Sequence, residues 1–341
     1  MSPLLPTRQL GKDGPQVTAI GYGAMGLSAF YAAAAPDAER LQFLDYVFDS
    51  GIHNWDTADV YGDSEELIGK WLARSGKRDQ LFLSTKGGGG VDGKGQSVVR
   101  SDPEYIKDAC SKSLSKLGVD NVDLYFIHRL DKVTPVEKTV STMVELKNEG
   151  KIKYLGLSEC SASTLRRACK IHHITAVQIE YNPFSLEIEQ NGLLAACREL
   201  GVAVVCYAPL GRGFLTGQIK SPKDFPEGDI RRFLPRFSSE NFPKNLKIIE
   251  SLQEIAQSKG VEVSTLTLAW LLAQGGDIIP IPGTTKQHNL DLNIQALSLE
   301  LTTEESEKIR DVVEAAGVSG GRYHAAWDDS FADTPELSAT T

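Results

Sequence analysis

The stretch NWDTADVYG, residues 54–62, begins as an apolar strand and ends in a polar loop. The apolar lead-in over residues 52–55 predicts a buried strand that stops at Asp56. Tyr61 follows a few residues later, and Gly62 then releases the chain. A phenol can donate a proton to a carbonyl oxygen, provided that a neighbouring cation lowers its pKa from about 10. The stretch therefore predicts a proton donor, Tyr61, near a carboxylate, Asp56, that would hold such a cation.

Two later apolar strands also end in a side chain with chemical uses. The run LFLSTK ends in Lys86, and the run VDLYFIH ends in His128. The carboxyl ends of parallel strands gather at one face of a β/α fold, where active sites lie. We therefore expect both side chains to meet Asp56 and Tyr61. Taken singly, each has an ordinary alternative, because surface tyrosines, solvated lysines and core histidines are common.

Short apolar strands alternate with amphipathic helices along most of the chain. Helices are expected over residues 37–50, 64–74, 103–117, 135–148, 163–171 and 193–200. Strands are expected over residues 17–21, 52–56, 81–86, 122–128, 154–157, 176–179, 202–207 and 278–282. This alternation predicts an α/β fold of the (β/α)8 TIM-barrel class, in one domain over residues 1–330 with a polar tail over residues 331–341. The turn sequence GKDGP predicts an N-terminal β-hairpin over residues 7–17.

Three other segments depart from this regular alternation. Residues 21–26, GYGAMG, match the G-x-G-x-x-G pattern of a Rossmann-type dehydrogenase, which requires a helix that opens on the glycines. Residues 27–35 lack helical periodicity and a helix start falls at residues 36–37, so a tight strand-end loop is favoured. The glycine run over residues 87–90 predicts another loop. Residues 209–243 are too long for an ordinary connection and predict a lid after strand seven.

Composition excludes several classes of function. The chain has 341 residues, 41% of them apolar, and its longest apolar runs are only strand-length, so no membrane span is expected. A net charge of −9 argues against a nucleic-acid partner, which needs a basic face. The five cysteines form no C-x-x-C pair, which favours free thiols in the cytoplasm. The six histidines show no H-x-x-x-H spacing, so no metal is expected.

The ordered set Asp56, Tyr61, Lys86 and His128 resembles the aldo-keto reductase superfamily. The resemblance continues through GLSE at residues 156–159, QIEYN at 178–182, YAPLG at 207–211 and IPGTT at 281–285, so it covers nearly the whole chain. The opening GYGAMGLS and the pair His128–Arg129 are most similar to the perakine-reductase-like and pyridoxal-reductase-like branch. The resemblance implies a barrel whose N-terminal hairpin plugs one end.

The resemblance also implies NADP(H) as the cofactor. The residues that it assigns to the cofactor are Gly23, Met25, Asp56, Ser158, Gln178, Tyr207, Pro209, Leu210, Gly211, Gly213, Leu215, Gly283, Thr284, Thr285, Lys286, Asn289 and Asn293. Ser158 and Gln178 would bind the nicotinamide carboxamide, and Tyr207 would stack on the ring. Backbone N–H groups of residues 210–215 would face the pyrophosphate. Glu159 stands where relatives often carry Asn, so its role is left open.

Residues 283–289, GTTKQHN, follow strand eight and enter a helix, which predicts an anion site at the helix N-terminus. The resemblance assigns this site to the 2′-phosphate and adenine of NADP. Asn289 stands where many relatives carry Arg, and Lys286 is a point charge without the bidentate geometry of a guanidinium. NADP preference is therefore expected to be less sharp than with an arginine.

These assignments imply an oxidoreductase in which NADPH reduces an aldehyde or ketone and Tyr61 donates the proton. Asp56 would fix Lys86, Lys86 would lower the pKa of Tyr61, and His128 would orient the carbonyl oxygen. Trp55, Phe30, Tyr31 and residues 323–327 are candidate walls of an apolar substrate pocket, with ordinary packing as the alternative. An aromatic aldehyde, a quinone-like ketone or pyridoxal would fit there.

Two other classes of function stay open at this point. One is an NADP(H)-binding sensor or regulatory subunit with little turnover, because relatives of this fold serve as channel-associated sensors. The other is the Rossmann-type dehydrogenase that would use residues 21–26. The sequence leaves the oligomeric state undetermined.

Overall fold

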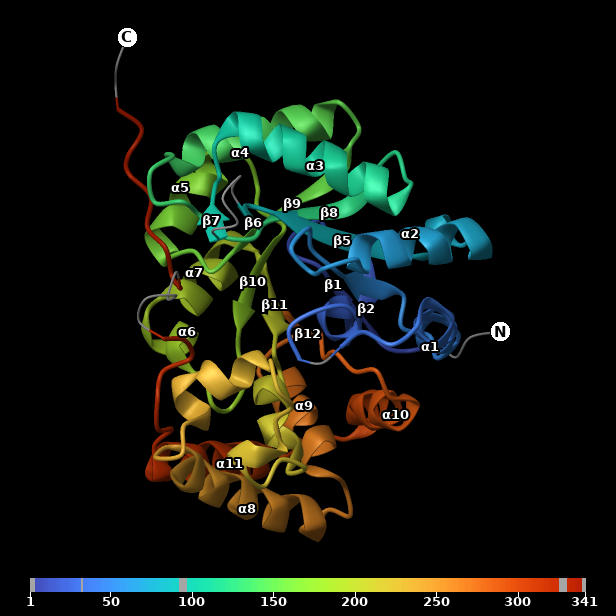
Figure 1. Cartoon of the computed structure of the whole chain (residues 1–341). Helices are drawn as coiled ribbons and strands as arrows, with labels where there is room; N and C mark the ends of the chain where they lie inside the picture. Colours follow the sequence, from blue (N-terminus) through green and yellow to red (C-terminus); the bar gives the residue numbers. More distant parts are fainter. Residues whose placement is uncertain (1–3, 32, 92–96, 325–329, 339–341) are drawn as a thin grey trace.

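The computed structural model describes residues 4–31, 33–91, 97–324 and 330–338, and its centre is a parallel sheet of eight strands (Figure 1). In chain order the strands are β3 (Tyr22–Gly23), β4 (Asn54–Asp56), β5 (Phe82–Gly87), β8 (Val122–Ile127), β9 (Ile152–Ser158), β10 (Ala176–Glu180), β11 (Ala203–Tyr207) and β12 (Ile278–Pro280). Strands that are consecutive in this order pair with each other. The Gly21 N–H, just before β3, donates to Pro280 O of β12 at 2.9 Å, which joins the first strand to the last and closes the sheet. The predicted (β/α)8 barrel is confirmed, and a closed sheet rules out the open Rossmann fold.

Helices cover the outside of the barrel. They are α1 (Asp37–Asp49), α2 (Ser64–Ser75), α3 (Pro103–Leu117), α4 (Val136–Asn148), α5 (Ala162–Ile171), α6 (Glu187–Gln190), α7 (Leu193–Leu200), α8 (Phe242–Ser258), α9 (Val263–Ala273), α10 (Gln287–Gln295) and α11 (Thr303–Ala316). Helix α3 shows why the predicted bounds hold: Asp102 accepts from Tyr105 N–H at its start, and Gly118 ends it in the left-handed region. Within the described part of the chain, no helix is long and apolar enough to span a membrane.

The N-terminal hairpin closes the amino end of the barrel. Strands β1 (Thr7–Gln9) and β2 (Gln16–Thr18) pair antiparallel, and Lys12 N–H between them donates to Gly201 O, just before β11. The hairpin side chains Leu10 and Val17 are buried among apolar residues of the barrel interior. The prediction of a first barrel strand over residues 17–21 is wrong, because Val17 pairs with Arg8 and the barrel strand begins at Tyr22.

The side chains of β4 alternate between the two faces of the sheet, and Trp55 lies on the face that packs against the helices. Successive side chains point to opposite faces of a sheet, so Trp55 points away from its neighbours Asn54 and Asp56. Its indole packs on Trp71 of α2, with ring centroids 4.6 Å apart, and is fully buried. Trp55 is therefore a packing residue between sheet and helix, and its prediction as a pocket wall is wrong.

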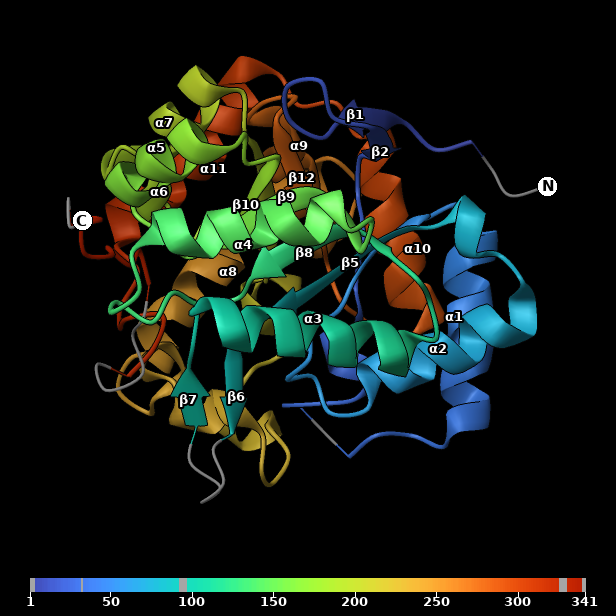
Figure 2. The same ribbon diagram turned by 90° about the horizontal axis from the view of Figure 1, so that it is seen from above.

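The glycine run after β5 also differs from its prediction. Gly87 ends β5, and β6 (Gly89–Val91) pairs antiparallel with β7 (Ser97–Val99), so most of this run is extended backbone. Figure 2 places β6 and β7 on the opposite side of the barrel from β1 and β2. By contrast, the glycines at residues 21–26 lead into one four-residue 3-10 turn, η1 (Ala24–Leu27), as expected for a strand-end loop.

Two long segments lie over the carboxyl end of the barrel. The lid, residues 209–243, contains the short turns η3 (Gly211–Thr216), η4 (Pro222–Asp224), η5 (Ile230–Phe233) and η6 (Pro235–Phe237). Of its five phenylalanines, Phe233 is exposed and the other four are buried, namely Phe214, Phe225, Phe237 and Phe242. The C-terminal segment, described over residues 317–324 and 330–338, runs in red from α11 past α6 and α5 in Figure 1. The proposed boundary at residue 330 stays a prediction.

Candidate functional site

The four predicted side chains meet at the carboxyl end of the barrel strands. Asp56 ends β4, Lys86 lies near the end of β5, and His128 directly follows β8. Lys86 Nζ donates to Asp56 Oδ1 at 2.5 Å, and it lies 3.4 Å from the Tyr61 hydroxyl. The Tyr61 and His128 rings meet edge to face with centroids 5.6 Å apart. Four residues from three separate stretches of sequence therefore form one cluster.

The Asp56–Lys86 ion pair is buried and fully bonded. Lys86 has no exposed surface, and it also donates to the Thr57 carbonyl at 2.6 Å. Gln178 Nε2 donates to the other Asp56 oxygen at 2.8 Å. Burial alone would lower the pKa of Lys86, but the adjacent Asp56 carboxylate and Tyr61 raise it above its ordinary value. The lysine is therefore held as a cation beside the phenol.

The protonation states of Tyr61 and His128 follow from burial. Burial raises the pKa of Tyr61 above its ordinary value, and Lys86 offsets only part of that effect. Lys86 therefore acts on this pKa in the predicted direction, but desolvation outweighs the cation and the net pKa is raised. Burial, with the Arg129 and Lys86 cations, holds the pKa of His128 well below its usual range. At neutral pH the phenol carries its proton and the imidazole is neutral.

A cavity of about 800 Å³ opens at this cluster and extends to α10. Pockets that hold small molecules and cofactors span about 300–1,000 Å³. Of the predicted catalytic residues, Asp56, Tyr61 and His128 line it, while Lys86 lies behind them. The predicted cofactor residues that line it are Gly23, Met25, Asp56, Ser158, Gln178, Tyr207, Pro209, Leu210, Gly213, Gly283, Thr284, Thr285, Lys286, Asn289 and Asn293.

Two predicted cofactor residues, Gly211 and Leu215, are buried and do not line the cavity. The backbone N–H groups of this turn are also engaged: Gly213 N–H and Leu215 N–H both donate to Leu210 O, at 2.9 and 3.1 Å. An anion in this part of the cavity would therefore depend on side chains such as Arg212 and Arg231, which line it.

The sequence comparisons agree with this geometry. Residues 19–314 match the aldo/keto reductase family. The curated protein "Aldo-keto reductase str7" of Strobilurus tenacellus is 49% identical over 340 residues, which is 98% of this chain and 99% of that protein. This chain belongs to the aldo/keto reductase family. "Aldo-keto reductase yakc [NADP(+)]" of Schizosaccharomyces pombe is another relative of this aldo/keto reductase, 45% identical with 98% and 99% of the two chains covered.

Solved structures give the aldo/keto reductase close neighbours in fold. The glycerol dehydrogenase AKR11B4 of Gluconobacter oxydans superposes with a TM-score of 0.80 at 27% identity, covering 91% of this chain and 95% of that one. The holo form of aldo-keto reductase AKR11C1 of Bacillus halodurans gives a TM-score of 0.74 at 27% identity, covering 90% and 96%. The resemblance seen in the sequence is confirmed at the level of the family, and the finer branch stays a prediction.

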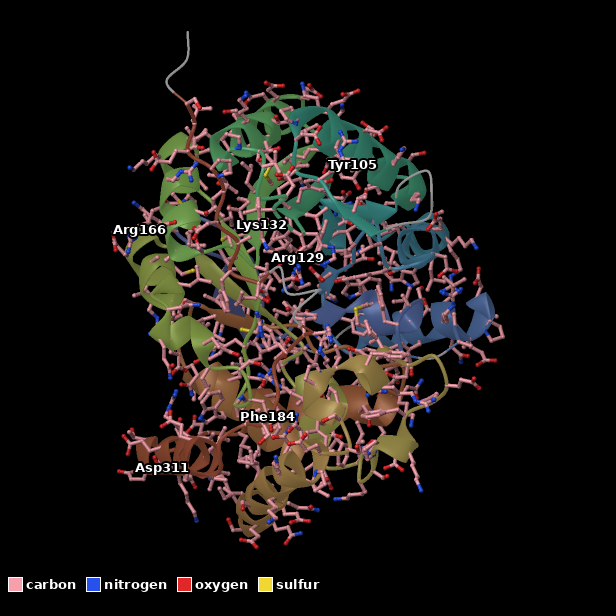
Figure 3. The ribbon with its side chains drawn as sticks, turned by 60° about the vertical axis from the view of Figure 1, so that its left-hand side comes forward. Tyr105, Arg129, Lys132, Arg166, Phe184 and Asp311 are labelled. Carbon is pink, nitrogen blue, oxygen red and sulfur yellow. The ribbon has the colours of Figure 1, made fainter. Side chains whose placement is uncertain are left out.

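The cavity of the aldo/keto reductase also contains arginines that the sequence did not assign to the site. Arg129, Arg212 and Arg231 line it, and Arg129 lies near the middle of the view in Figure 3, whereas Arg166 lies at its edge. Arg129 donates to His128 O at 2.8 Å and lies 3.4 Å from the Tyr323 hydroxyl. The sequence places Arg129 directly after a predicted catalytic residue, and that adjacency was the one signal that could have identified it. Arg212 and Arg231 lie in a lid without regular periodicity, so their positions had no sequence signal.

The predicted apolar pocket is partly supported at the Tyr61 end. Phe30, Tyr31 and Tyr323 line the cavity, and the Phe30 ring meets the Tyr61 ring edge to face at 6.2 Å. Residues 325–329, which complete the predicted pocket segment, lie outside the described part of the chain. Aromatic rings from the loop before α1 and from the C-terminal segment therefore line the cavity of the aldo/keto reductase, and the ring of Phe30 contacts that of Tyr61.

Proposed function

We propose that this aldo/keto reductase uses NADPH to reduce aldehyde or ketone carbonyls to alcohols, with Tyr61 as the proton donor. The observation that carries the proposal is the Tyr61 phenol at the cavity wall, 3.4 Å from the buried Lys86 ammonium that Asp56 holds in place. Burying the Lys86 charge costs several kcal/mol of folding free energy. A role for Lys86 beside the Tyr61 phenol gives a reason for that cost.

The donors that line the cavity suit a phosphorylated dinucleotide. Lys286 and the hydroxyls of Thr284 and Thr285 line one end, at the start of α10, where the helix dipole favours an anion. Ser158 and Gln178 line the other end beside Asp56, and both side chains can contact an amide. The relative yakc carries NADP(+) in its name, which supports the same cofactor here. NADPH, when bound, supplies the hydride.

The residues of this chain account for the proton. Tyr61 donates its phenolic proton to the oxygen that develops negative charge, and the Lys86 ammonium stabilises the phenolate that remains. Asp56 keeps Lys86 oriented through the 2.5 Å contact. His128 is neutral, so it can donate a hydrogen bond to the carbonyl oxygen but does not act as the acid.

We base the proposed substrate class on the aromatic rings that line the cavity. Phe30, Tyr31 and Tyr323 favour a flat aromatic carbonyl such as an aromatic aldehyde, a quinone-like ketone or pyridoxal, as in the branch that the sequence resembles. We therefore choose 4-nitrobenzaldehyde as the assay substrate. NADPH oxidation that depends on the aldehyde would support the proposal. Tight NADPH binding without turnover of this or other carbonyls would favour the sensor or regulatory subunit instead.

Replacing Lys286 by methionine is expected to raise the Kd for NADPH about five- to tenfold, the loss of one exposed charged contact. The Kd for NADH should stay unchanged, because NADH has no 2′-phosphate. Lys112→Met, at an exposed lysine on α3 away from the cavity, is the matched control. Titration of tryptophan fluorescence measures both constants. Equal weakening of NADH and NADPH would contradict the assignment of Lys286 to the 2′-phosphate.

The rate of carbonyl reduction is expected to be nearly constant between about pH 6 and 9. Burial raises the pKa of Tyr61, so the phenol stays protonated until the pH exceeds the ordinary value of about 10. Burial also lowers the pKa of His128, so the imidazole stays neutral below its ordinary value of about 6.5. The measurement is kcat/KM for aldehyde reduction against pH. A fall in the rate centred near pH 6.5 would show that His128 titrates and would contradict its neutral role.

A further inference from the structure

Glu159 holds a carboxylate in an unusual place, directly after Ser158 at the end of β9. Its side chain is fully buried and does not line the cavity, so it is turned away from the position of a bound ligand. Its φ of +50° lies in the left-handed region, which is strained for a residue with a side chain. Such a conformation persists where the surroundings fix it. The contacts of the carboxylate show what fixes Glu159.

Two side chains from distant parts of the chain bind the Glu159 carboxylate, and the Glu180 N–H donates to Oε1 at 3.4 Å. Arg322 donates to both of its oxygens, at 3.0 Å each, and the Tyr207 hydroxyl donates to Oε1 at 2.6 Å. Burial alone would raise the pKa of Glu159, but the Arg322 and Arg129 guanidiniums hold it below its ordinary value. The group is therefore a carboxylate, and charge-assisted hydrogen bonds of this kind are about twice as strong as neutral ones.

Both described parts of the C-terminal segment meet at Glu159. Arg322 belongs to the part that follows α11, and it lies over the ring of Phe331 at 5.0 Å. Ala332 belongs to the second part, and its N–H donates to the Glu159 carbonyl at 2.7 Å. The Glu159 side chain thus binds the part of the segment before residue 325, and the Glu159 carbonyl binds the part after residue 329.

The same contacts continue into the cavity wall. The Tyr207 hydroxyl lies 2.9 Å from the Tyr323 hydroxyl, which in turn lies 3.4 Å from Arg129. Tyr207, Tyr323 and Arg129 all line the cavity, whereas Glu159 and Arg322 lie behind them. Replacing Glu159 would therefore change two parts of the cavity wall. It would change the orientation of the Tyr207 ring and the position of the Tyr323 side chain.

We propose that Glu159 is a positioning residue, whose carboxylate holds both the Tyr207 ring and the C-terminal segment that places Tyr323 in the cavity. The inference rests on the proposed function, in which the nicotinamide lies against Tyr207 and the carbonyl substrate lies near Tyr323. Affinity for the dinucleotide and affinity for the substrate then depend on one carboxylate. The carboxylate of residue 159 thus sets the shape of the site from outside the cavity.

The chain contains a matched group of contacts away from the cavity. Glu189 accepts from Arg310 at 2.6 and 2.9 Å and from the Tyr181 hydroxyl at 2.5 Å, so it repeats the carboxylate, guanidinium and phenol of the Glu159 group. None of these three residues lines the cavity. Changes here test the structural cost of losing such a group without touching the site.

The test replaces the buried ion pair with apolar side chains, Glu159→Leu with Arg322→Met. Removing both charges together avoids a buried unpaired charge, so this variant is expected to fold. Glu159→Gln is the conservative variant, which keeps an acceptor for Tyr207 and loses the charge. Tyr207→Phe keeps the ring and removes its hydroxyl. Glu189→Leu with Arg310→Met is the control. Each protein is compared in its melting temperature, its Kd for NADPH, and its KM and kcat for 4-nitrobenzaldehyde.

The Glu159→Leu, Arg322→Met variant is expected to raise both the Kd for NADPH and the KM for the aldehyde about tenfold, the equivalent of one charge-assisted hydrogen bond at each wall. Glu159→Gln should fall between this variant and the wild type. Added to Tyr207→Phe, the double change should raise the Kd for NADPH less than twofold further, since the hydroxyl that connects Glu159 to the ring is already missing. The aldehyde KM should still rise, because Arg322, the neighbour of Tyr323, binds Glu159 directly and not through the Tyr207 hydroxyl.

Unchanged Kd and KM in a folded Glu159→Leu, Arg322→Met protein, or the same losses in the Glu189 control, would overturn the inference and leave Glu159 a purely structural residue. Failure of the proposed function gives a different result. In that case the wild-type protein would not oxidise NADPH with any carbonyl tested, while the effect of Glu159 on the Kd for NADPH would still be measurable.

Discussion

Replacing Tyr61 by phenylalanine is expected to lower kcat for carbonyl reduction by about 10²–10⁴-fold, the usual contribution of a general acid. The phenylalanine ring fills the same space beside Phe30 and His128, so the packing of the cavity changes little. The Kd for NADPH should therefore stay within about twofold of the wild-type value, since no contact to the cofactor is removed. Steady-state kinetics and fluorescence titration on the same preparation measure the two constants.

Tyr125→Phe is the matched control for this substitution. Tyr125 lies in β8 and is fully buried, and its hydroxyl has no hydrogen-bond partner among the described residues. Removing that hydroxyl should leave kcat unchanged and stability equal or slightly higher, because an unsatisfied buried polar group is lost. Wild-type kcat in the Tyr61→Phe protein would show that another group supplies the proton.

Replacing Lys86 by methionine should have two large effects. The phenol loses the cation that stabilises its phenolate, so we expect kcat to fall by at least about 10²-fold. Asp56 is left buried without its partner, and breaking a buried ion pair in this way costs about 3–5 kcal/mol of folding free energy. Urea denaturation and steady-state kinetics measure the two losses separately.

The double variant Asp56→Asn, Lys86→Met separates stability from catalysis. It removes both charges, so most of the lost stability should return, and the introduced amide can still accept a hydrogen bond from Gln178. Activity should stay low, because the ammonium beside Tyr61 is still missing. If either variant reduced the aldehyde at the wild-type rate, Lys86 would have no part in proton transfer.

Local sequence was enough to predict which side chains meet at the carboxyl end of the barrel. Asp56, Lys86 and His128 each interrupt an apolar strand at its carboxyl end, and the parallel barrel brings such ends together whatever the details of the loops. The mistakes near them have local physical reasons. The run VTAIG over residues 17–21 begins in the hairpin and leads into the barrel strand at Tyr22, and composition does not show where one stops and the other starts. The glycines of β6 are extended because β7 pairs with them, and tertiary pairing overrides a low strand propensity.

Contacts between distant residues were beyond the reach of the sequence. Glu159 and Arg322 are separated by 163 positions, and neither has a periodic or motif signal that relates it to the other. The raised pKa of Tyr61 depends on how deeply the phenol is buried, which residue type and spacing do not determine. The prediction for Trp55 could have been made correctly, since strand alternation already turns it away from Asp56.

The hairpin at the amino end of the barrel has a practical consequence for handling the protein. An affinity tag or fusion partner joined ahead of β1 attaches at the hairpin end of the barrel, away from the opening of the cavity, so immobilisation through it should leave that opening accessible. A tag joined beyond Ser338 instead extends the same segment that carries Tyr323. Kinetic work is therefore best done on protein purified through its amino terminus.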